Sequence, residues 1–372
     1  MRLALDATPL LGQRSGVGRY VTGLVHGLAE ISPELRPRLT LFSVRGQLPA
    51  DLPRGARRAP GRFPARLLRP LWARTAFPPV EILSGPVDVF HGTNFVLPPA
   101  ARAGGVVTVH DLAFLRYPGT VTGDVAHYRD LVPRALRRAR AVVTVSEAMA
   151  DEIRAEYAWL TPRVFVAPNG VDPSWARAQP ASDEDLRRLG IPPRYVVFVG
   201  NMEPRKNLGT LLRAHTAARR QDPRVPPLVL VGPAGWGDRW QGAAPDARDA
   251  VLAGYLPGDD LQRVVARATA VCMPSRYEGF GLPVLEAMAA GRPVLASDIP
   301  AHREIAQGHA ILLPPDDTDA WAEALTGLDR MTGGDAARRA HAAGFTWARS
   351  AATHLEAYRQ AAERRRGDKG PT

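Results

Sequence analysis

The sequence has a single cysteine and only two lysines, and it contains no apolar run long enough to cross a membrane as a helix. One cysteine, Cys272, excludes a disulfide framework and a zinc site built from cysteines. It lies in an apolar run, where cysteine usually packs as a small buried side chain. The N-terminus enters a strand-like segment directly, without the pattern of a secretory signal. These features predict a cytoplasmic protein.

Although lysine is scarce, the chain is basic, with 48 Lys and Arg against 37 Asp and Glu and a net charge of +11. Apart from Lys206 and Lys369, every basic residue is arginine. So strong a bias is typical of coding composition, and we expect many of these arginines to be solvated surface. The same bias makes Lys206, an internal lysine, conspicuous. A basic nucleic-acid-binding protein is an alternative suggested by charge, but no recognised reader motif accompanies it.

The length of 372 residues predicts two domains. Short apolar segments that read as strands alternate with helical patterns, which favours parallel α/β sheets. The stretch 173–193 is polar and resembles a linker, apart from a short helix that starts at Ser182. We therefore predict one α/β domain over 1–172, a second over 173–345, and a final helix with a charged tail over 346–372.

The stretch 270–298 combines a strand, a glycine-rich loop and a helix start. Pro283 suits the first turn of the helix, and the loop would point backbone N–H groups and the positive end of the helix dipole at a phosphate. Glu278 and Glu286 flank this position. A carboxylate beside a phosphate needs neutral hydroxyls to bind, which indicates a ligand with both phosphates and sugar hydroxyls. An ordinary phosphate loop with a solvated glutamate is the alternative.

Arg205 and Lys206 stand between a strand predicted over 195–199 and a helix predicted from Leu208. Arginine offers a bidentate fork and lysine a mobile point charge, and both suit a diphosphate. Two adjacent cations in a loop are otherwise commonly solvated.

Gly16 and Gly18 lie in the segment SGVGRY, between a strand over 2–6 and a helix predicted from about Tyr20. A strand, a glycine turn and a helix start make a second phosphate-facing platform. The spacing is not GxGxxG, so the dinucleotide fingerprint is incomplete and a simple tight turn remains the alternative.

Polar residues also follow two other predicted strands. The strand over 88–91 runs into HGTNF, which contains His91 and Asn94, and the strand over 106–109 runs into His110 and Asp111. Parallel sheets collect their ligand residues at such strand ends. A histidine there is more often a packing or capping residue, and Asn94 could equally serve a turn.

Together these motifs resemble the retaining glycosyltransferases of the large family 4 type (glycosyltransferase group 1), which includes sucrose synthase and bacterial mannosyltransferases. Glu278 and Glu286, with GFGLP between them, look like the paired-glutamate signature of that family. SGVGRY, His110–Asp111 and Arg205–Lys206 precede it in the family's order, so the resemblance covers nearly the whole chain. It implies the GT-B architecture: two Rossmann-like domains that face each other over a cleft, with the last helix crossing back to the first domain.

The resemblance also implies roles for individual residues. The catalytic set would place a histidine against the transferred sugar, two cations on the leaving phosphates and a glutamate on the donor-sugar hydroxyls: His110, Arg205, Lys206 and Glu278. The donor-binding set would include the ribose ligand Glu286, two neighbours of the base and the glycine-loop residues: Glu286, Tyr255, Leu256, Gly16, Gly18, Gly279, Phe280, Gly281 and Leu282. The acceptor side would include Arg19, His91, Asn94 and Asp111.

The reaction implied is transfer of a hexose, with retention, from a nucleotide-diphosphate sugar to a hydroxyl of a saccharide, lipid-linked or small-molecule acceptor. The family resemblance implies no further cofactor and no metal. SGVGRY and HGTNF are most similar to mannosyl- and rhamnosyl-transferring relatives, so GDP-mannose is favoured over a UDP-sugar as donor. A nucleotide-sugar epimerase of the same architecture is the alternative enzyme.

The segment 52–80 contains seven arginines, several prolines and no acidic residue, with aromatic and leucine side chains interleaved. Such a segment could contact an anionic bilayer, a phosphorylated acceptor or nucleic acid. A solvated loop with a short helix is the simplest interpretation. Peripheral contact with the inner face of an anionic membrane, or with an acidic acceptor, is the functional one, and we expect no nucleic-acid partner.

Overall fold

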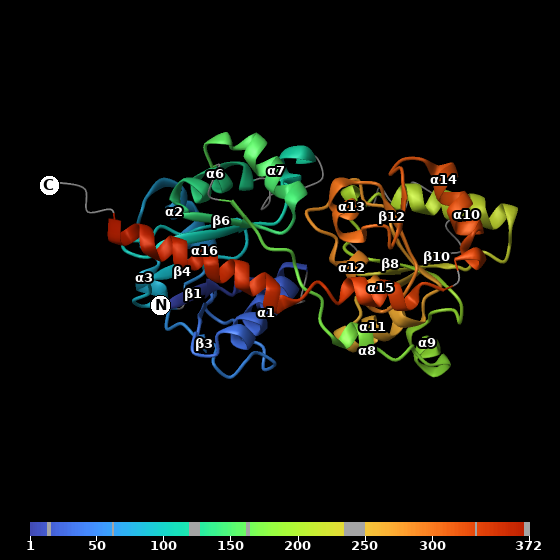
Figure 1. The fold of residues 1–372 in the computed structure, drawn as a ribbon, viewed down its shortest axis with the longest axis horizontal. Coiled ribbons are helices and arrows are strands. Elements are labelled where there is room, and N and C mark those ends of the chain that lie inside the picture. Colours follow the sequence, from blue (N-terminus) through green and yellow to red (C-terminus); the bar gives the residue numbers. More distant parts are fainter. Residues whose placement is uncertain are drawn as a thin grey trace. The chain divides into compact units, whose positions relative to one another are not determined.

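The computed structural model describes residues 1–12, 16–61, 63–118, 127–160, 164–233, 250–331 and 333–367. The chain forms two compact units (Figure 1): unit 1 comprises 1–170 with 345–372, and unit 2 comprises 171–344. Each unit contains one parallel sheet with helices packed on it, which confirms the predicted α/β fold class.

The sheet of unit 1 has seven parallel strands in the order β3-β2-β1-β4-β5-β6-β7. Four of them are buried at every residue and mostly apolar, as expected for strands covered on both faces. The strands are β1 (Leu3–Asp6), β2 (Arg38–Thr40), β3 (Arg57–Arg58), β4 (Val89–Gly92), β5 (Gly104–Val109), β6 (Ala141–Thr144) and β7 (Val164–Val166).

Helices cover both faces of this sheet. They are α1 (Gly16–Ile31), α2 (Ala65–Arg74), α3 (Glu81–Ser84), α4 (Ala113–Arg116), α6 (Tyr128–Arg138), α7 (Glu147–Glu156) and α16 (Trp347–Gly367), with 3₁₀ turns η1 (Thr8–Leu10) and η3 (Ala158–Leu160). A Cβ on Gly104 would touch Ala361 of α16, and one on Gly105 would approach Arg138 of α6. Successive strand residues point to opposite faces, so α16 and α6 lie on opposite sides of the sheet (Figure 1).

Helix α16 packs along α1, and two glycines of α1 permit the close approach. A Cβ on Gly23 would lie 2.0 Å from Cε2 of Trp347, and one on Gly27 would lie 2.3 Å from the Trp347 carbonyl oxygen. Larger residues would therefore push the two helices apart. From α16, Ala351, Tyr358 and other residues complete the hydrophobic core that α1 and the strands begin.

The sheet of unit 2 has six parallel strands in the order β10-β9-β8-β11-β12-β13. These strands are β8 (Val196–Val199), β9 (Leu228–Val231), β10 (Ala250–Gly254), β11 (Ala270–Met273), β12 (Val294–Ser297) and β13 (Ile311–Leu313). The helices are α8 (Ser174–Arg177), α9 (Asp183–Leu189), α10 (Leu208–Gln221), α11 (Gly258–Arg267), α12 (Leu282–Ala289), α13 (Pro300–Ala306), α14 (Thr318–Thr326) and α15 (Asp335–Ala342), with η4 (Pro204–Lys206) and η7 (Leu328–Arg330).

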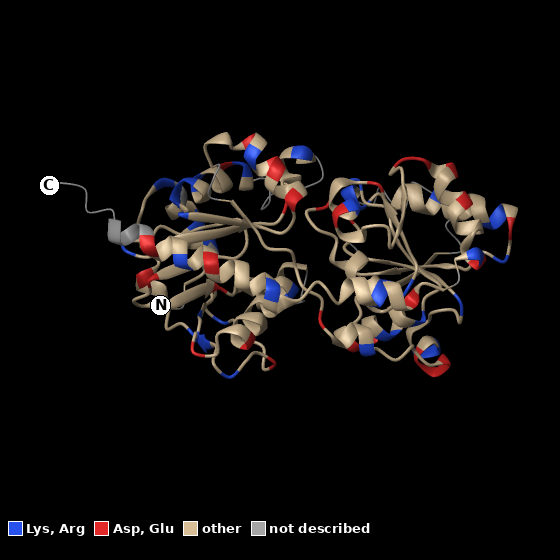
Figure 2. Cartoon of the chain, viewed as in Figure 1, with Lys and Arg blue, Asp and Glu red and all other residues tan. Residues whose placement is uncertain are grey.

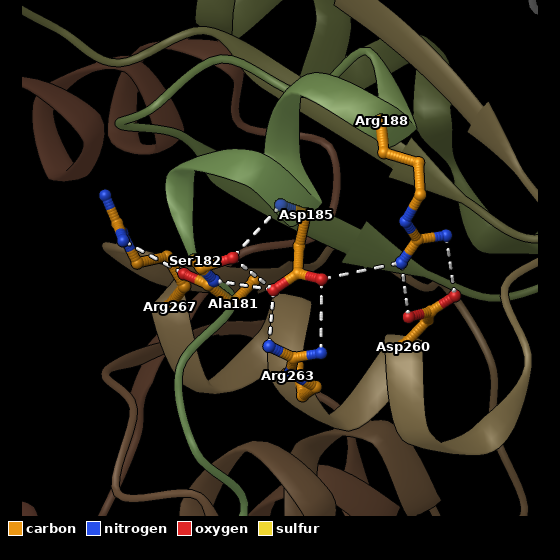
Figure 3. A network of polar contacts seen from close by, with 7 residues as sticks. All are labelled: Ala181, Ser182, Asp185, Arg188, Asp260, Arg263 and Arg267. Atoms are coloured by element: carbon orange, nitrogen blue, oxygen red, sulfur yellow. Dashed lines mark hydrogen bonds and ion pairs between the residues drawn. The ribbon is translucent and has the colours of Figure 1, made fainter.

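The stretch 173–193, which resembles a linker in sequence, is folded onto unit 2. Ser182 caps α9 in a reciprocal capping box with Asp185, whose carboxylate also accepts from Arg263 of α11 (Figure 3). Arg188 adds an ion pair to Asp260 at 2.9 Å, and Arg267 donates to the Ala181 carbonyl oxygen at 2.9 Å. The short helix predicted to start at Ser182 is confirmed, and its polar residues bind α11.

In the segment 52–80, the helix α2 carries arginines and no acidic residue (Figure 2). Leu68 and Trp72 of α2 are buried, but Leu67 is 66% exposed and Leu71 is 39% exposed. Across the part of the chain that the structure describes, no helix has the length and apolar composition needed to span a bilayer.

Candidate functional site

The carboxyl ends of β8 and β11 lie side by side at the centre of the unit 2 sheet, because these strands pair directly. The chain first winds from β8 to β9 and β10 and then returns to β11 on the other side of β8. Open parallel sheets bind ligands at such a switch point, beyond the carboxyl ends of the strands. The turn η4 follows β8, and the loop 274–281 follows β11, so both contribute side chains to this edge.

Lys206 and Glu278, from these two loops, are in direct contact. The Lys206 ammonium donates to Oε1 of Glu278 at 2.6 Å, and Nη1 of Arg205 donates to Oε2 of the same carboxylate at 3.0 Å. The Ser275 hydroxyl donates to Oε1 at 2.7 Å. Three donors therefore fix the Glu278 carboxylate, whose side chain is 8% exposed. Arg205, Lys206 and Glu278, predicted from the sequence to share a site, lie together.

Glu203 is a fourth charged member of this cluster that the sequence did not single out. Its carboxylate lies 2.7 Å from Nη2 of Arg205, and its side chain is 11% exposed. The cluster thus holds two cations and two carboxylates, and Arg205 bridges the two acids. The sequence could have indicated Glu203 only through its position two residues before Arg205. A glutamate in a polar loop has no distinguishing pattern of its own.

Charge within the cluster keeps Glu278 ionised. Burial favours the neutral acid, but the attraction of Lys206 and Arg205 outweighs burial and holds the Glu278 pKa well below its usual range. The carboxylate is therefore an acceptor of hydrogen bonds at neutral pH. Because a carboxylate has about four lone-pair positions and three donors already use it, room remains for one sugar hydroxyl.

Helix α12 starts at this edge, with its first-turn N–H groups next to the glycine loop. Gly281 precedes the helix with φ +106°, a conformation that favours glycine, and a Cβ there would lie 3.0 Å from Cδ2 of His302. His302 is fully buried, and its Nδ1 donates to the Ser297 carbonyl oxygen at 2.9 Å. Nε2, which has no hydrogen-bond partner among the described residues, therefore presents a lone pair near Gly281.

The remaining residues predicted to bind the donor lie along the same sheet edge. Glu286 is 4% exposed within α12, and Leu282 is the first residue of that helix. Gly279 and Phe280 are buried in the loop. Tyr255 and Leu256 follow β10, two strands from β8, with Tyr255 42% exposed and Leu256 buried.

In unit 1, Gly16 and Gly18 lie in the first turn of α1, four and two residues before the predicted helix start at Tyr20. The expected glycine turn is therefore helical, and its N–H groups belong to the unsatisfied first turn of a helix. Gly16 is exposed, and Arg19 is partly exposed. Ser15, the first residue of the SGVGRY motif, lies outside the described residues.

The His110 ring is held by the HGTNF segment and by α1. Its Nε2 donates to the Thr93 carbonyl oxygen at 2.8 Å, which leaves the lone pair on Nδ1. The ring meets Tyr20 edge-on at 4.7 Å between centroids and meets Phe95 edge-on at 5.7 Å. Phe95 has φ +61°, a costly conformation for a bulky residue. A strained backbone beside a clamped histidine is typical of a functional site.

His91 belongs instead to a buried network that joins the sheet to α16. The His91 ring nitrogens bond to the Tyr358 hydroxyl at 2.8 Å and the Thr108 hydroxyl at 2.7 Å. The Tyr20 hydroxyl bonds to Thr108 at 2.8 Å and to Nε2 of His354 at 2.7 Å. His91 is fully buried with both nitrogens engaged, which leaves neither for a ligand.

One direction of hydrogen bonding satisfies this whole network. Nδ1 of His354 must donate, because its partner at 2.8 Å is the Ser350 carbonyl oxygen, so Nε2 accepts from Tyr20. Tyr20 then accepts from Thr108, which accepts from Nε2 of His91. In this arrangement both histidines are neutral, in agreement with their lowered pKa values. Burial lowers the pKa of His354 to about 4 and also lowers the pKa of His91.

Asn94 and Asp111 have local contacts. The Asp111 carboxylate accepts from the Ala113 N–H at 3.0 Å at the start of α4. Oδ1 of Asn94 is buried, without a hydrogen-bond partner among the described residues. Across the described ranges, no group of three or more His, Cys, Asp or Glu residues is placed to hold a metal.

Comparison with known proteins identifies relatives for both units. Residues 14–175 match the family model "Glycosyltransferase Family 4", and residues 193–329 match "Glycosyl transferases group 1". The chain is 29% identical over 355 residues to O-antigen chain mannosyltransferase B of Escherichia coli, covering 86% of this chain and 88% of the relative. It is 32% identical over 302 residues to a D-inositol 3-phosphate glycosyltransferase of Kineococcus radiotolerans, covering 71% and 68%.

Solved structures of similar fold include sucrose-phosphate synthase from Thermosynechococcus elongatus, with a TM-score of 0.71 and 20% identity over 97% of this chain and 98% of that one. WaaG, a glycosyltransferase involved in lipopolysaccharide biosynthesis, has a TM-score of 0.68 and 16% identity over the full length of both chains. The chain therefore belongs to the family 4 glycosyltransferases (glycosyl transferases group 1), and its two parallel-sheet units have the GT-B fold.

Proposed function

We propose that the protein transfers a hexose, with retained anomeric configuration, from a nucleotide-diphosphate sugar to a hydroxyl of a saccharide or lipid-linked acceptor. The observation that carries this proposal is the contact of Arg205 and Lys206 with Glu278 at the switch point of unit 2. It places two cations for a diphosphate beside a fixed carboxylate for sugar hydroxyls. The start of α12 adds the positive end of a helix dipole.

In the proposed reaction, the bond between the anomeric carbon and the diphosphate oxygen breaks and a bond to the acceptor oxygen forms on the same face. The departing phosphate oxygen takes the proton of the acceptor hydroxyl. Arg205 and Lys206 stabilise the negative charge that develops on the phosphate, and Glu278 positions the sugar. His110 presents the lone pair of Nδ1, which suits it to accept from a sugar hydroxyl. No metal is part of this proposal.

Mannose is the favoured sugar, with GDP-mannose as donor. The E. coli relative aligned over most of the chain is named as a mannosyltransferase, which supports this choice. Other relatives are named as D-inositol 3-phosphate glycosyltransferases, so a UDP-sugar and a small phosphorylated acceptor form the second combination to test.

A thermal-shift screen of nucleoside diphosphates and their sugars tests the donor site. We expect GDP or GDP-mannose to raise the melting temperature of the wild type, and Lys206→Ala to abolish the shift. Arg276→Ala is the matched control, because Arg276 lies in the loop that carries Glu278 but pairs with the exposed Asp316 at 2.6 Å. If no nucleotide raises the melting temperature of the wild type, the proposal is contradicted. Retention is then read from the anomeric proton coupling of the product.

We also propose that α2 contacts an anionic membrane. It exposes Leu67 and Leu71 one helical turn apart, near the exposed Phe63 and Phe77, and the segment 52–80 carries seven arginines and no acid. Co-sedimentation with phosphatidylglycerol vesicles should fall for the double variant Leu67→Ser, Leu71→Ser. Ile31→Ser, which alters an exposed apolar residue of α1, is the control. Equal sedimentation of all three proteins would exclude the contact.

A further inference from the structure

A cavity of about 600 Å³, widely open to solvent, lies at the surface of unit 1 between the chain that follows β2 and the start of α2. Its walls are formed by Phe42, Ser43, Val44, Arg45, Pro64 and Arg66. Because the sheet is parallel and β2 ends at Thr40, the cavity opens at the carboxyl edge of the sheet. This is the edge to which His110 also belongs, at the end of β5.

A continuous series of hydrogen bonds joins His110 to the wall of this cavity. His110 donates to the Thr93 carbonyl oxygen at 2.8 Å, and the Thr93 hydroxyl donates to the Asp6 carbonyl oxygen at 2.6 Å. The Asp6 carboxylate accepts from the Thr8 N–H at 2.9 Å. The Thr8 hydroxyl accepts from the Phe42 N–H at 3.0 Å. The cavity wall and His110 are therefore held in one fixed arrangement.

The separation between the two can be estimated from the strand order. β2, β1, β4 and β5 are neighbours in that sequence, so three strand spacings separate β2 from β5. At about 4.8 Å each, the distance is on the order of 14 Å. That span exceeds one sugar ring, so a group in the cavity would belong to a part of the acceptor remote from the reacting hydroxyl.

The lining of the cavity suits an anion. It includes two guanidinium groups, Arg45 and Arg66, and no carboxylate. Within the described part of the chain, neither arginine takes part in an ion pair. The loop that carries Arg45 is held in place, since the Gly46 N–H donates to the Ser43 hydroxyl at 3.1 Å and Arg58 donates to the Gly46 carbonyl oxygen at 2.8 Å. Guanidinium forks bind phosphate oxygens in pairs.

We infer that this cavity binds a phosphoryl group of the acceptor, so that the acceptor is a phosphorylated saccharide rather than a neutral one. The inference rests on the proposed function and specifies its acceptor. Arg45 and Arg66 bind the phosphate while the sugar beyond it extends along the sheet edge towards His110. The phosphate belongs either to a free sugar phosphate or to a lipid carrier, and the cavity recognises the group that both share.

Calorimetric titration of the full chain, saturated with a nucleoside diphosphate to occupy the donor site, tests this inference. The probes are mannose 1-phosphate, the uncharged methyl mannoside, and a polyprenyl-diphosphate-linked sugar in detergent micelles. We expect the double variant Arg45→Ala, Arg66→Ala to bind the two phosphorylated probes at least roughly tenfold more weakly, since it loses charge-assisted hydrogen bonds. Arg102→Ala, which alters an exposed arginine outside 52–80 just before the amino end of β5, should bind as the wild type does.

The double variant Arg45→Lys, Arg66→Lys provides a folded comparison, because it keeps the charge but loses the fork and should bind with intermediate affinity. If the affinities for both phosphorylated probes depend on Arg45 and Arg66, the site is supported for a phosphate from either source. Dependence of the lipid-linked probe alone assigns the phosphate to the carrier.

Equal binding of mannose 1-phosphate and methyl mannoside, or equal effects of Arg102→Ala and the double alanine variant, would overturn the inference. The second of these results would indicate general attraction to a charged micelle surface. Nucleotide-induced thermal shifts are measured separately. If those shifts persist while Arg45 and Arg66 have no effect on binding of the phosphorylated probes, the proposed acceptor site is wrong. The proposed glycosyl transfer is then unaffected.

Discussion

At the carboxyl edge of the unit 2 sheet, Arg205 contacts both Glu203 and Glu278, and Lys206 contacts Glu278. The formal charges of these four side chains cancel. A diphosphate therefore meets cations that are already paired, and it must compete with Glu203 and Glu278 for them. The positive end of the α12 dipole also lies at this edge and adds to the attraction for phosphate.

Replacing Lys206 by alanine should reduce turnover on the order of 10²–10³-fold, by analogy with other electrostatic groups that act on the leaving charge. The change also leaves Glu278 with one fewer donor. Steady-state kinetics with the donor identified by the thermal-shift screen measures the effect. Arg276→Ala should stay within about twofold of the wild type, because its partner Asp316 is 66% exposed and such surface pairs contribute little. Similar losses in both variants would contradict the assignment.

Glu203→Gln should have the opposite effect on ligand binding. The substitution removes one negative charge and releases Nη2 of Arg205, so nucleoside diphosphates should bind roughly three- to tenfold more tightly at low salt. Calorimetric titration at two ionic strengths measures the gain, which should shrink as salt rises. Asp316→Asn, which removes an acid from the exposed pair with Arg276, is the control. A weaker affinity for Glu203→Gln would show that Glu203 positions Arg205 rather than competing with the ligand.

The buried histidine network should make unit 1 sensitive to acid. Burial lowers the His354 pKa from 6.5 to about 4. In the unfolded chain His354 therefore takes up a proton near pH 6.5, whereas in the folded chain it stays neutral until the pH approaches 4. The stability that depends on neutral His354 is fully present above pH 6.5 and is lost as the pH falls towards 4. At pH 5 the loss is about 2 kcal/mol. Tyr20, His91 and His110 surround the ring, and none supplies a negative charge at this pH to offset the loss.

Urea unfolding of unit 1, followed between pH 7 and 5, measures this loss. His354→Gln should have a smaller pH slope than the wild type, although His91 retains part of it. The control His26→Gln changes an exposed histidine of α1 and should keep the full slope. A His354→Gln slope equal to that of the wild type would refute the assignment.

The sequence predicted best which residues form the centre of the site. Arg205, Lys206 and Glu278 occur in distinctive loops, and strand order alone brings those loops together. Glu203 and His302 escaped notice because their importance depends on a neighbour from another part of the chain or on burial. His91 drew attention as a strand-end histidine, but its environment depends on α16, more than 250 residues later in the chain.

At the scale of single elements, one helix start differs from the sequence expectation and another agrees with it. α1 begins at Gly16 rather than near Tyr20. Its start was misplaced because glycine favours turns and helix starts alike, and the N–H groups of a first helical turn have no partner within the helix in any case. α9 is the short helix predicted to start at Ser182, and it forms because Ser182 and Asp185 cap it and Arg263 binds it.

Gly27→Ala should destabilise unit 1 by roughly 1–3 kcal/mol, as overpacking generally does. The new methyl group would lie 2.3 Å from the Trp347 carbonyl oxygen, so α1 and α16 would have to separate. Urea unfolding measures the change. Gly16→Ala is the control in the same helix, since no atom lies within 4 Å of its Cβ position, and it should leave stability unchanged or slightly higher. Unchanged stability for Gly27→Ala would show that the two helices tolerate a wider spacing.

At the scale of the whole molecule, each unit has its own sheet and hydrophobic core, so a ligand held by one unit should stabilise that unit selectively. We expect a nucleoside diphosphate to slow amide exchange across 171–344, most strongly in the loops after β8 and β11. At a ligand concentration of about 100 Kd the stabilisation is about 2.7 kcal/mol. Hydrogen exchange with mass spectrometry measures it, and Lys206→Ala should abolish it. Protection confined to 1–170 would contradict the placement of the donor site.

The division of unit 1 into 1–170 and 345–372 has a consequence for biosynthesis. Translation delivers β1 to β7 first, then all of unit 2, and only afterwards α16, whose Tyr358 and Ala361 complete the unit 1 core. Unit 2 can fold on the ribosome as soon as its last helix emerges. The segment 1–170 remains incompletely folded until α16 emerges as well, because the apolar face that α16 covers is still exposed. A premature stop codon shortly before Trp347 would therefore spare unit 2 and leave the N-terminal sheet as a target for chaperones and proteases.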